Sequence, residues 1–495
     1  MIWEVAAILL GFIFLKYIWD HRIGRRRCKI AGPRGLPLIG NALEFMQIFP
    51  FDQFTFWRQK YGDIFKIQLL NKDIVILNGD AVYDALVGQS DDFSGRPDIP
   101  RLQLFNDCED IATRNPDNKW KDYRKICHQG LRQFGKGVAH IEKITMHEIE
   151  DCIAKFEAQN GAFNPNIDIY RSVTNILMIM ILGEKLDSSD PLIDKLAQCQ
   201  ETLDQAFGPK YLSLDIIPWI RYIPGVKTFS GFKDSVASVH KVFSDIIKER
   251  KMQLLDGQDK AEGILDMLLA TQEERKGTDK NISDKTMNGL IQDMVIPGIN
   301  TTSAALKSML AYLVVHPEIQ QTIQQEIDSV LGNRCPSIKD RSSMPYTDAF
   351  LLESLRYMSH LPIGIPHAAI RDVTIKGHFI PKGTQVWLYL FGLHHDDRFF
   401  PDPWSFTPQR FLDKDGGLIP PDERKLLLPF GAGRRVCLGE QLARIRMFLF
   451  ITTFLQKYTF LPETPDNLPD CDIKNGTMGA VMNLKDYNIR LERRK

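Results

Sequence analysis

One short stretch of the chain combines residue types that seldom occur together. Residues 430–440 have the sequence FGAGRRVCLGE, in which Cys437 lies among three glycines and close behind two arginines. A thiolate, the form of cysteine that binds metals, is stabilised by nearby positive charge and by backbone N–H groups that glycine lets approach. The apolar run that follows predicts a helix, whose N-terminal dipole also favours a thiolate. The stretch therefore predicts a metal ligand at Cys437.

Zinc and disulfide chemistry do not suit Cys437. A structural zinc site needs four protein ligands, and no other cysteine or histidine lies at finger spacing. The eight cysteines of the chain include no Cys-x-x-Cys pair and are too sparse for a disulfide framework. One thiolate suffices for a metal whose other ligands come from a cofactor, as in haem. The alternative is that Cys437 is a buried cysteine beside a glycine turn and binds no metal.

The residues around Cys437 follow the pattern Phe-x-x-Gly-x-Arg-x-Cys-x-Gly. This pattern resembles the haem-binding signature of the cytochromes P-450. The matching residues are Phe430, Gly433, Arg435, Cys437 and Gly439. The resemblance implies that Cys437 binds the iron of haem b as a thiolate and that the other four residues hold the loop or the cofactor.

Two further motifs of that family are structural. Glu353 and Arg356 resemble its Glu-x-x-Arg motif, and the spacing places both charges on one helix face. Residues 406–411 (FTPQRF) resemble the proline–arginine loop, whose arginine, here Arg410, would join that pair in a buried network. Without this context an exposed ion pair would be the simpler interpretation.

Residues 297–303 (PGINTTS) resemble the family's oxygen-activation motif. The resemblance assigns Thr301 to holding water and relaying protons. The usual acid before the threonine is Asn300 here, and an amide cannot relay a proton as a carboxylate does. Pro297 occupies a position that usually holds a small residue, where the helix is expected to be distorted. The alternative is a polar patch that bonds its own helix backbone.

The resemblance also assigns residues to the two propionates of haem. A guanidinium donates two parallel hydrogen bonds to a carboxylate, and an indole N–H donates one. The assigned residues are Arg96, Trp120, Arg124, His367 and Arg435. In contrast, the adjacent His394 and His395 precede two aspartates in a loop-like stretch, and we expect them at the surface.

The amino terminus is more apolar than the rest of the chain. Eighteen residues, 2–19, would span roughly 27 Å as a helix, about one bilayer core. Basic residues follow the apolar run, which favours an uncleaved anchor with a cytosolic body over a signal peptide. We expect a transmembrane anchor at 1–21, a basic and proline-rich hinge at 22–45 and a catalytic domain at 46–495.

The body is predicted to be mainly α with a smaller β part. Apolar residues recur at three- and four-residue spacings from about 80 to 330, whereas 65–79 and 372–390 predict hairpins. Lys+Arg and Asp+Glu both number 62, so charge gives no indication of nucleic-acid binding. The resemblance covers nearly the whole chain and implies the cytochrome P-450 fold.

Together these features predict a haem-thiolate monooxygenase, single-pass in the endoplasmic reticulum membrane. The chain resembles animal microsomal members, in particular the steroid 17-hydroxylase and aryl-hydrocarbon-hydroxylase group. The resemblance implies a lipophilic substrate (steroid-, lipid- or xenobiotic-like), bound by the segments 99–115, 294–298, 361–365 and 476–481. It implies electrons from an NADPH-dependent flavoprotein reductase, with cytochrome b5 as a further candidate partner. The basic residues expected at the reductase surface are Lys121, Lys125, Arg132, Arg434 and Arg444.

Two other functions stay open at this point. A haem-thiolate isomerase or dehydratase would rearrange peroxides without a reductase; Thr301 argues against it and Asn300 keeps it open. A haem-binding sensor or carrier would bind haem without catalysing reductase-dependent oxygen consumption.

Overall fold

The structure is a computed structural model. It describes Gly11 and residues 28–36, 39–45, 50–69, 72–134, 138–187, 190–216, 218–223, 225–256 and 263–494. The predicted anchor at 1–21 lies outside the described residues apart from Gly11, and so does the first part of the predicted hinge. Among the helices of the described part, none is both long enough and apolar enough to cross a bilayer.

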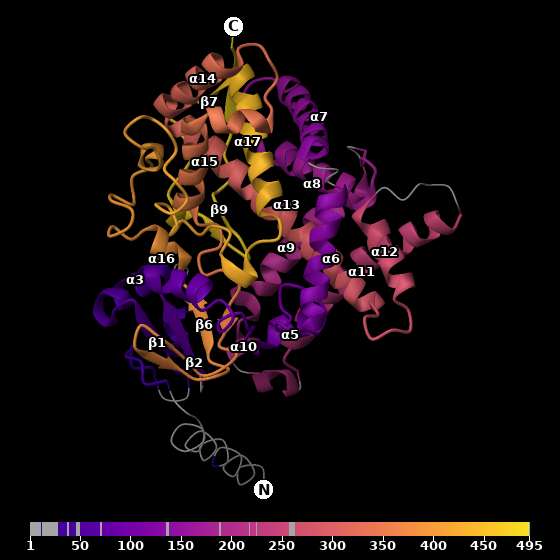
Figure 1. The fold of residues 1–495 in the computed structure, drawn as a ribbon, viewed down its shortest axis with the longest axis vertical. Helices are drawn as coiled ribbons and strands as arrows, with labels where there is room; N and C mark the ends of the chain where they lie inside the picture. The colour runs from indigo at the N-terminus through magenta and orange to yellow at the C-terminus, as the bar shows by residue number, and fades with distance from the viewer. Residues whose placement is uncertain are drawn as a thin grey trace.

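The described chain is mainly helical with a smaller β part, as predicted. Figure 1 shows the helices gathered around α13, with the sheet that contains β1, β2 and β6 at one side. The α-helices are α2 (Ala42–Phe45), α3 (Pro50–Tyr61), α4 (Asp80–Tyr83), α5 (Pro100–Asn106), α6 (Asn118–Phe134), α7 (Val138–Glu157), α8 (Asn166–Leu182), α9 (Pro191–Phe207), α10 (Ser213–Ile216), α11 (Thr228–Leu255), α12 (Ile264–Glu274), α13 (Asp284–Val315), α14 (Pro317–Leu331), α15 (Pro345–Met358), α16 (Leu390–His394) and α17 (Glu440–Lys457). The strands are β1 (Ile64–Leu69), β2 (Lys72–Leu77), β3 (His367–Ala368), β4 (Val373–Ile375), β5 (His378–Ile380), β6 (Gln385–Leu388), β7 (Tyr458–Pro462), β8 (Thr477–Met478), β9 (Met482–Asn483) and β10 (Ile489–Arg493).

The largest sheet has the strand order β1-β2-β6-β3. The predicted hairpin at 65–79 is confirmed, because β1 and β2 pair antiparallel with Phe65 opposite Ile76. The hairpin predicted at 372–390 is confirmed only in its first half, where β4 and β5 pair. The second half, β6, instead runs parallel to β2, with Ile76 opposite Trp387. The β2 residues paired with β6 are buried, as is usual for parallel strands.

Helix α13 forms the centre of the helical part. Its first turn is capped by Ser283, whose hydroxyl oxygen accepts a hydrogen bond from the Thr286 N–H at 3.0 Å. The helix packs against α8, α15 and α17, and its second half contributes the completely buried Leu306, Met309 and Leu310. Burying such side chains stabilises the fold by about 1.5–3 kcal/mol each. The site described below is therefore built on a rigid central helix.

The charged residues of α15 form a buried network, as the motif predicts. Glu353 and Arg356 are both completely buried, and Glu353 accepts from Arg356 Nε at 2.7 Å and from Arg410 Nε at 3.1 Å. The Thr407 N–H also donates to Glu353 at 2.8 Å, and Arg356 Nη1 donates to the His394 carbonyl at 2.6 Å. The network thereby ties α15 to two loops of the carboxyl-terminal part.

The expectation that His394 and His395 lie at the surface is wrong. Both are buried, because α16 carries them into the core. The His394 Nε2 accepts from the Leu428 N–H at 3.0 Å, and its Nδ1 bonds the Ser359 hydroxyl at 2.7 Å. The polar composition of this stretch reflects internal hydrogen bonding, which composition alone cannot distinguish from solvation.

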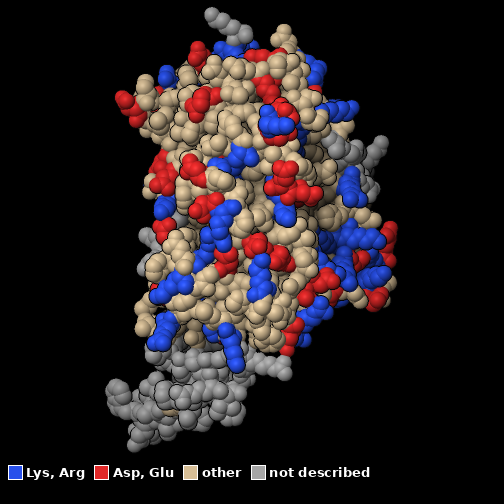
Figure 2. All heavy atoms as spheres, turned by 60° about the vertical axis from the view of Figure 1, so that its left-hand side comes forward, with Lys and Arg blue, Asp and Glu red and all other residues tan. Residues whose placement is uncertain are grey.

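Surface charge is mixed in sign. Figure 2 shows lysine and arginine side chains interspersed with aspartate and glutamate over the face in view. This mixture agrees with the equal numbers of basic and acidic residues in the chain.

We predict that Glu353→Gln strongly destabilises the protein. The substitution keeps the shape but leaves Arg356 and Arg410 without their buried counter-charge, which costs roughly 3–5 kcal/mol. Chemical denaturation of the purified proteins would measure the loss. The control is Glu273→Gln, whose partner Lys276 is solvent-exposed, and it is expected to leave the midpoint unchanged. Equal midpoints for both variants would contradict the prediction.

Candidate functional site

The loop that carries Cys437 is fixed at Gly433. This glycine has a φ of +66°, and a Cβ there would overlap the Leu86 carbonyl and the Ser90 side chain. The next residue, Arg434, donates its backbone N–H to the Ser90 hydroxyl at 2.8 Å. Only glycine permits this close approach, so Gly433 determines where Cys437 lies.

The loop closes on itself and leads into α17. The Cys437 N–H donates to the Phe430 carbonyl at 2.9 Å, and the Ala443 N–H donates to the Gly439 carbonyl at 2.9 Å at the helix start. The Arg444 guanidinium lies over the Phe430 ring at 4.7 Å from its centroid. Cys437 thus lies directly before the helix N-terminus, as the sequence predicts.

Cys437 is accessible to solvent, yet enough protein surrounds it that burial raises the pKa of its thiol. Glu440 adds to this rise, whereas the Gly439 N–H and the positive charges of Arg124 and Arg446 lower the thiol pKa. The thiol is thus accessible to a ligand, and the effect of burial on its pKa outweighs the opposing effects of the Gly439 N–H and the two arginines.

Helix α13 has a less buried stretch at residues 296–301, between well-buried turns on either side. Pro297 is exposed, and α13 nevertheless continues through it. The Thr301 hydroxyl donates to the Pro297 carbonyl at 2.8 Å, and Asn300 is half-buried beside it. The Thr301 hydroxyl therefore donates its hydrogen to a backbone carbonyl of this turn. The lone pairs of its oxygen remain available to accept hydrogen bonds.

The five residues assigned to the propionates lie in one neighbourhood. The Arg435 guanidinium lies 4.4 Å from the centroid of the Trp120 ring, and the Arg124 guanidinium lies at 5.8 Å. Trp120 Nε1 and Arg435 Nη1 both donate to the Ile111 carbonyl at 3.0 Å. The charges of Arg96 and Arg435 both lower the pKa of His367, so these three groups are also close together.

In this structure the donors of the neighbourhood are directed at backbone carbonyls. Arg96 Nε donates to Ala112 at 2.7 Å, and Arg435 Nε donates to Ser94 at 2.8 Å. His367 Nδ1 lies 2.6 Å from the Phe93 carbonyl, which can only accept, so Nδ1 carries the proton. Burial, together with Arg96 and Arg435, lowers the pKa of His367 to about 3, and the ring is neutral.

The same residues fit the propionates of haem. Arg96, Arg124 and Arg435 form no ion pair with any described residue. Burial, then the neighbouring Arg435, lower the pKa of Arg96, and burial, then Arg124, lower that of Arg435 to about 10. Three crowded, partly buried cations without paired carboxylates are stabilised by an added pair of carboxylates. Together with the accessible Cys437 thiol, this donor set suits haem.

Hydrogen bonds made by flanking residues connect the four segments expected to bind substrate. Asp293 of α13 accepts from the Ile111 N–H at 2.6 Å, which fixes segment 99–115 to the helix one turn before Pro297. Arg96 Nη1 donates to the Ile365 carbonyl at 3.1 Å. His360 exchanges two bonds of 2.9 Å with the Met482 backbone, which places segment 361–365 beside segment 476–481.

Two residues of this region were missed in the sequence. Asp293 lies two helical turns before Thr301 on the same face, and its pKa is raised well above the ordinary value by burial and by Asp110. Arg446 of α17 is buried, and its Nη2 donates to the Gly298 carbonyl at 3.1 Å. The available signal was helical spacing for Asp293, and a charge inside an apolar run for Arg446.

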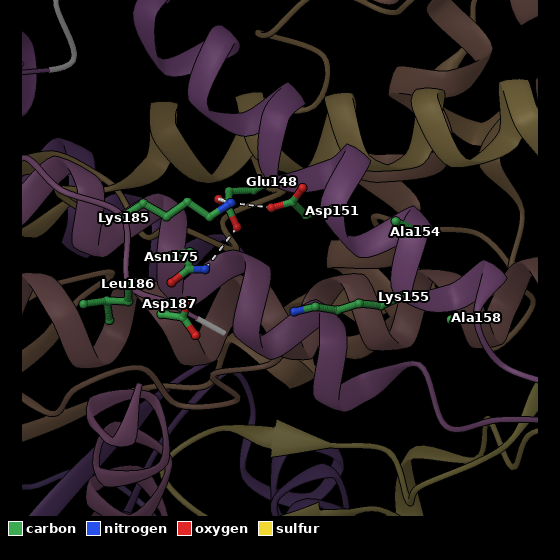
Figure 3. Close-up of a pocket in the computed structure, with 9 residues that line it drawn as sticks. All are labelled: Glu148, Asp151, Ala154, Lys155, Ala158, Asn175, Lys185, Leu186 and Asp187. Carbon is green, nitrogen blue, oxygen red and sulfur yellow. Dashed lines mark hydrogen bonds and ion pairs between the residues drawn. The ribbon is translucent and has the colours of Figure 1, made fainter. Parts of the chain in front are cut away.

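A separate groove lies between α7, α8 and the segment after α8, with a volume of about 610 Å³. Figure 3 shows the Lys185 ammonium directed at Glu148 and Asp151, with which it forms ion pairs. The His147 ring also lies near both carboxylates, but Lys185 already supplies their positive counter-charge. None of the predicted site residues lines this groove, and we assign it no part in the function.

Comparison with known proteins agrees with this geometry. The family profile described as Cytochrome P450 matches residues 30–491. Cytochrome P450 1A1 of Opsanus tau is 34% identical over 484 residues, covering 93% of this chain and 91% of the relative. Cytochrome P450 2K1 of Oncorhynchus mykiss is 33% identical, covering 92% and 90%. Cytochrome P450 2D27 of Mesocricetus auratus is 31% identical, covering 93% and 92%.

The chain therefore belongs to the cytochrome P450 family. Membership defines a haem-dependent monooxygenase whose cofactor is haem b, as the resemblance implied. The predicted fold is confirmed by the family match, while the membrane anchor stays a prediction.

We predict that Arg435→Ala weakens haem binding about tenfold or more. The variant loses a charge-assisted hydrogen bond to a propionate, worth about 1.5–3 kcal/mol. Haem titration of the apoprotein, followed optically, would give the two dissociation constants. Arg434→Ala is the matched control, because that side chain instead pairs with Asp91 at the surface and its loss should leave haem affinity unchanged. Equal weakening by both variants would contradict the assignment.

Proposed function

We propose that the protein is a membrane-anchored haem-thiolate monooxygenase that inserts one oxygen atom from O₂ into a lipophilic substrate, with electrons from an NADPH-dependent reductase. The observation that carries the proposal is the accessible thiol of Cys437, held by a glycine-constrained loop beside three arginines without ion pairs. A metal ligand and a set of carboxylate-binding cations in one region match the iron and the propionates of haem.

Cys437 is the residue we assign to the iron. Its sulfur would bind the iron as a thiolate, while Gly433, Gly439 and Phe430 hold the loop that presents it. The propionates are assigned to Arg96, Trp120, Arg124, His367 and Arg435. When bound, the haem supplies the iron centre that activates dioxygen, and the axial thiolate favours cleavage of the O–O bond.

Thr301 is proposed to control protons at this centre. Its hydroxyl hydrogen is directed at the Pro297 carbonyl, so the oxygen presents lone pairs to the less buried side of α13. Water bound there donates to Thr301 Oγ1 and is held ready to deliver a proton. Asn300 beside it orients water through its amide, but the amide has no acidic proton to donate. Proton supply is therefore proposed to come from solvent through bound water.

The substrate is proposed to be an apolar molecule. The four segments joined by hydrogen bonds carry Ile296, Ile363, Ile365 and Met478, of which Ile365 and Met478 are exposed. Exposed apolar side chains on adjoining segments form a surface that water wets poorly and an apolar ligand covers. The class includes steroid-, lipid- and xenobiotic-like compounds.

The cellular setting follows the sequence. We propose residues 1–21 as a single transmembrane anchor in the endoplasmic reticulum, 22–45 as the connecting hinge and 46–495 as the cytosolic catalytic domain. In the described part of the connector, Cys28 and Ile30 are buried against the body. Anchoring places the body beside the membrane in which a lipophilic substrate dissolves.

The partner is proposed to be a flavoprotein reductase that meets the thiolate side of the haem, with cytochrome b5 as a further partner. Lys121, Lys125 and Arg132 are exposed on α6 and supply positive charge for an acidic surface. Arg434 and Arg444 pair with Asp91 and Glu440, so their charges are partly compensated. We therefore give α6 the larger share of the docking.

Isotope incorporation tests the reaction class. Purified protein, reductase, NADPH and a panel of apolar compounds are incubated under ¹⁸O₂, and products are analysed by mass spectrometry. A monooxygenase incorporates one labelled atom per product and requires NADPH. Conversion of an organic peroxide without NADPH, with no NADPH-dependent product, would instead identify a peroxide isomerase or dehydratase. Haem binding without either reaction would indicate a sensor or carrier.

We predict that Thr301→Ala uncouples the reaction. Removing the hydroxyl removes the acceptor that holds the proton-delivering water, so product per NADPH should fall by roughly a hundredfold. Product and hydrogen peroxide are measured per NADPH consumed. Ser303→Ala is the matched control, because the Ser303 hydroxyl makes the same type of bond, 2.8 Å to the Ile299 carbonyl. Equal coupling in both variants would argue against the role of Thr301.

Asn300→Asp should act in the opposite direction. A carboxylic acid at this position adds a titratable proton donor beside Thr301, so product per NADPH is expected to rise several-fold, within the range of acid–base effects. The rise should be lost as pH increases beyond the pKa of the new acid. Unchanged coupling across this pH range would show that proton supply is not limited at position 300.

A further inference from the structure

Arg446 is a buried charge close to the centre of the site. It lies in α17, nine positions after Cys437, and only 1% of its surface is exposed. Its Nη2 donates to the Gly298 carbonyl and to the Thr302 hydroxyl oxygen, both at 3.1 Å. One guanidinium therefore connects the helix that follows the thiol to the α13 turn that carries the oxygen-activation motif.

The charge of Arg446 has no counter-ion among the described residues. No described carboxylate lies within ion-pair distance of it, and its Nε and Nη1 are buried without a hydrogen-bond partner. The neighbours along the helix are Ile445, Met447 and Phe448, all buried. Burying an unpaired cation is strongly unfavourable, and an apolar residue would fill this position at lower free energy.

The group stays charged despite its burial. Burial lowers the pKa of Arg446 to about 10, which is still well above neutral pH, and the negative form of Cys437 raises it. Arg446 in turn lowers the thiol pKa of Cys437. The charges of the two side chains therefore act on each other, and little solvent surrounds the charge on Arg446 to screen it.

We propose that Arg446 raises the reduction potential of the iron bound at Cys437, by placing an uncompensated positive charge in the wall between α13 and α17. The inference rests on the haem ligation proposed above. Reduction of ferric to ferrous iron adds one electron from the reductase and thus one negative charge to the site. A nearby buried cation favours the reduced form, because little solvent screens the attraction.

Other arginines of the region differ from Arg446 in their surroundings. Arg444, two positions earlier, reaches solvent and pairs with Glu440 at 2.9 Å. Arg124 also acts on Cys437, but the haem propionates are its proposed counter-charges. Arg446 is thus the buried cation of this region that is paired neither with a described carboxylate nor with a proposed haem propionate, and Arg444 is its natural control.

Potentiometric titration of the purified haem protein tests this inference. Arg446→Gln removes the charge. We expect the equilibrium constant for reduction of ferric to ferrous iron to fall about tenfold, equivalent to a reduction potential lower by about 59 mV for a one-electron couple. Arg446→Lys keeps the charge, and Arg444→Gln removes a screened one. Both should stay within about threefold of the wild-type constant, which is less than 30 mV on the same scale.

A second pair of variants leaves Arg446 in place. Thr302→Asp puts a carboxylate beside Nη2 and compensates its charge, whereas Thr302→Asn is nearly the same shape and neutral. We expect the equilibrium constant for reduction of the iron to be about tenfold lower in the Asp variant than in the Asn variant. If Arg446→Gln does not fold or does not retain haem, this pair still tests whether the charge of Arg446 affects the reduction potential.

The outcomes separate this inference from the proposed function. Variants that keep the optical signature of thiolate-ligated iron and the wild-type potential overturn the role of Arg446 alone. Loss of haem in both Arg446→Gln and Thr302→Asp would also overturn it, because Arg446 would then serve haem retention. Wild-type protein without thiolate-ligated iron overturns the proposed function and this inference together.

Discussion

The close approach of Gly433 to residues 86–90 is the constraint on which the site depends. No side chain fits between the loop and the Leu86 carbonyl, so the loop can dock only with glycine there. That docking fixes Cys437 in front of α17, and α17 in turn is held to α13 through Arg446. The thiol, the oxygen-activation segment and the arginine neighbourhood are therefore parts of one rigid arrangement, which is the preorganisation that a large cofactor requires.

Buried and partly buried arginines connect this arrangement, and they differ in whether the protein supplies a counter-charge. Arg356 is neutralised within the protein by Glu353, which makes it a structural residue. Arg96 and Arg435 repel each other and have no paired carboxylate among the described residues, which suits them to an anionic cofactor. Arg446 has neither kind of partner. The presence or absence of a protein counter-charge thus distinguishes the arginine that stabilises the fold from the arginines available to bind an anionic ligand.

The sequence could predict the features that depend on local pattern. Cys437 before a helix and the hairpin at 65–79 follow from spacing within a few residues, whereas the burial of the Glu353–Arg356 pair was implied by the family resemblance. Long-range contacts lay beyond such patterns: β6 leaves its expected hairpin to join β2, and His394 finds its partners Ser359 and Leu428 in distant segments. For the same reason Asp293 and Arg446 became visible only once α13, α17 and the segment 110–112 were placed together.

The optical spectrum of the dithionite-reduced protein with carbon monoxide tests the central claim most directly, because the position of the Soret band reports the ligand opposite carbon monoxide. The account predicts a strongly red-shifted band in the wild-type protein and its absence in folded Cys437→Ser protein. A reduced, haem-loaded wild-type protein without the red shift, or a Cys437→Ser variant that retains it, would contradict the assignment of Cys437 to the iron.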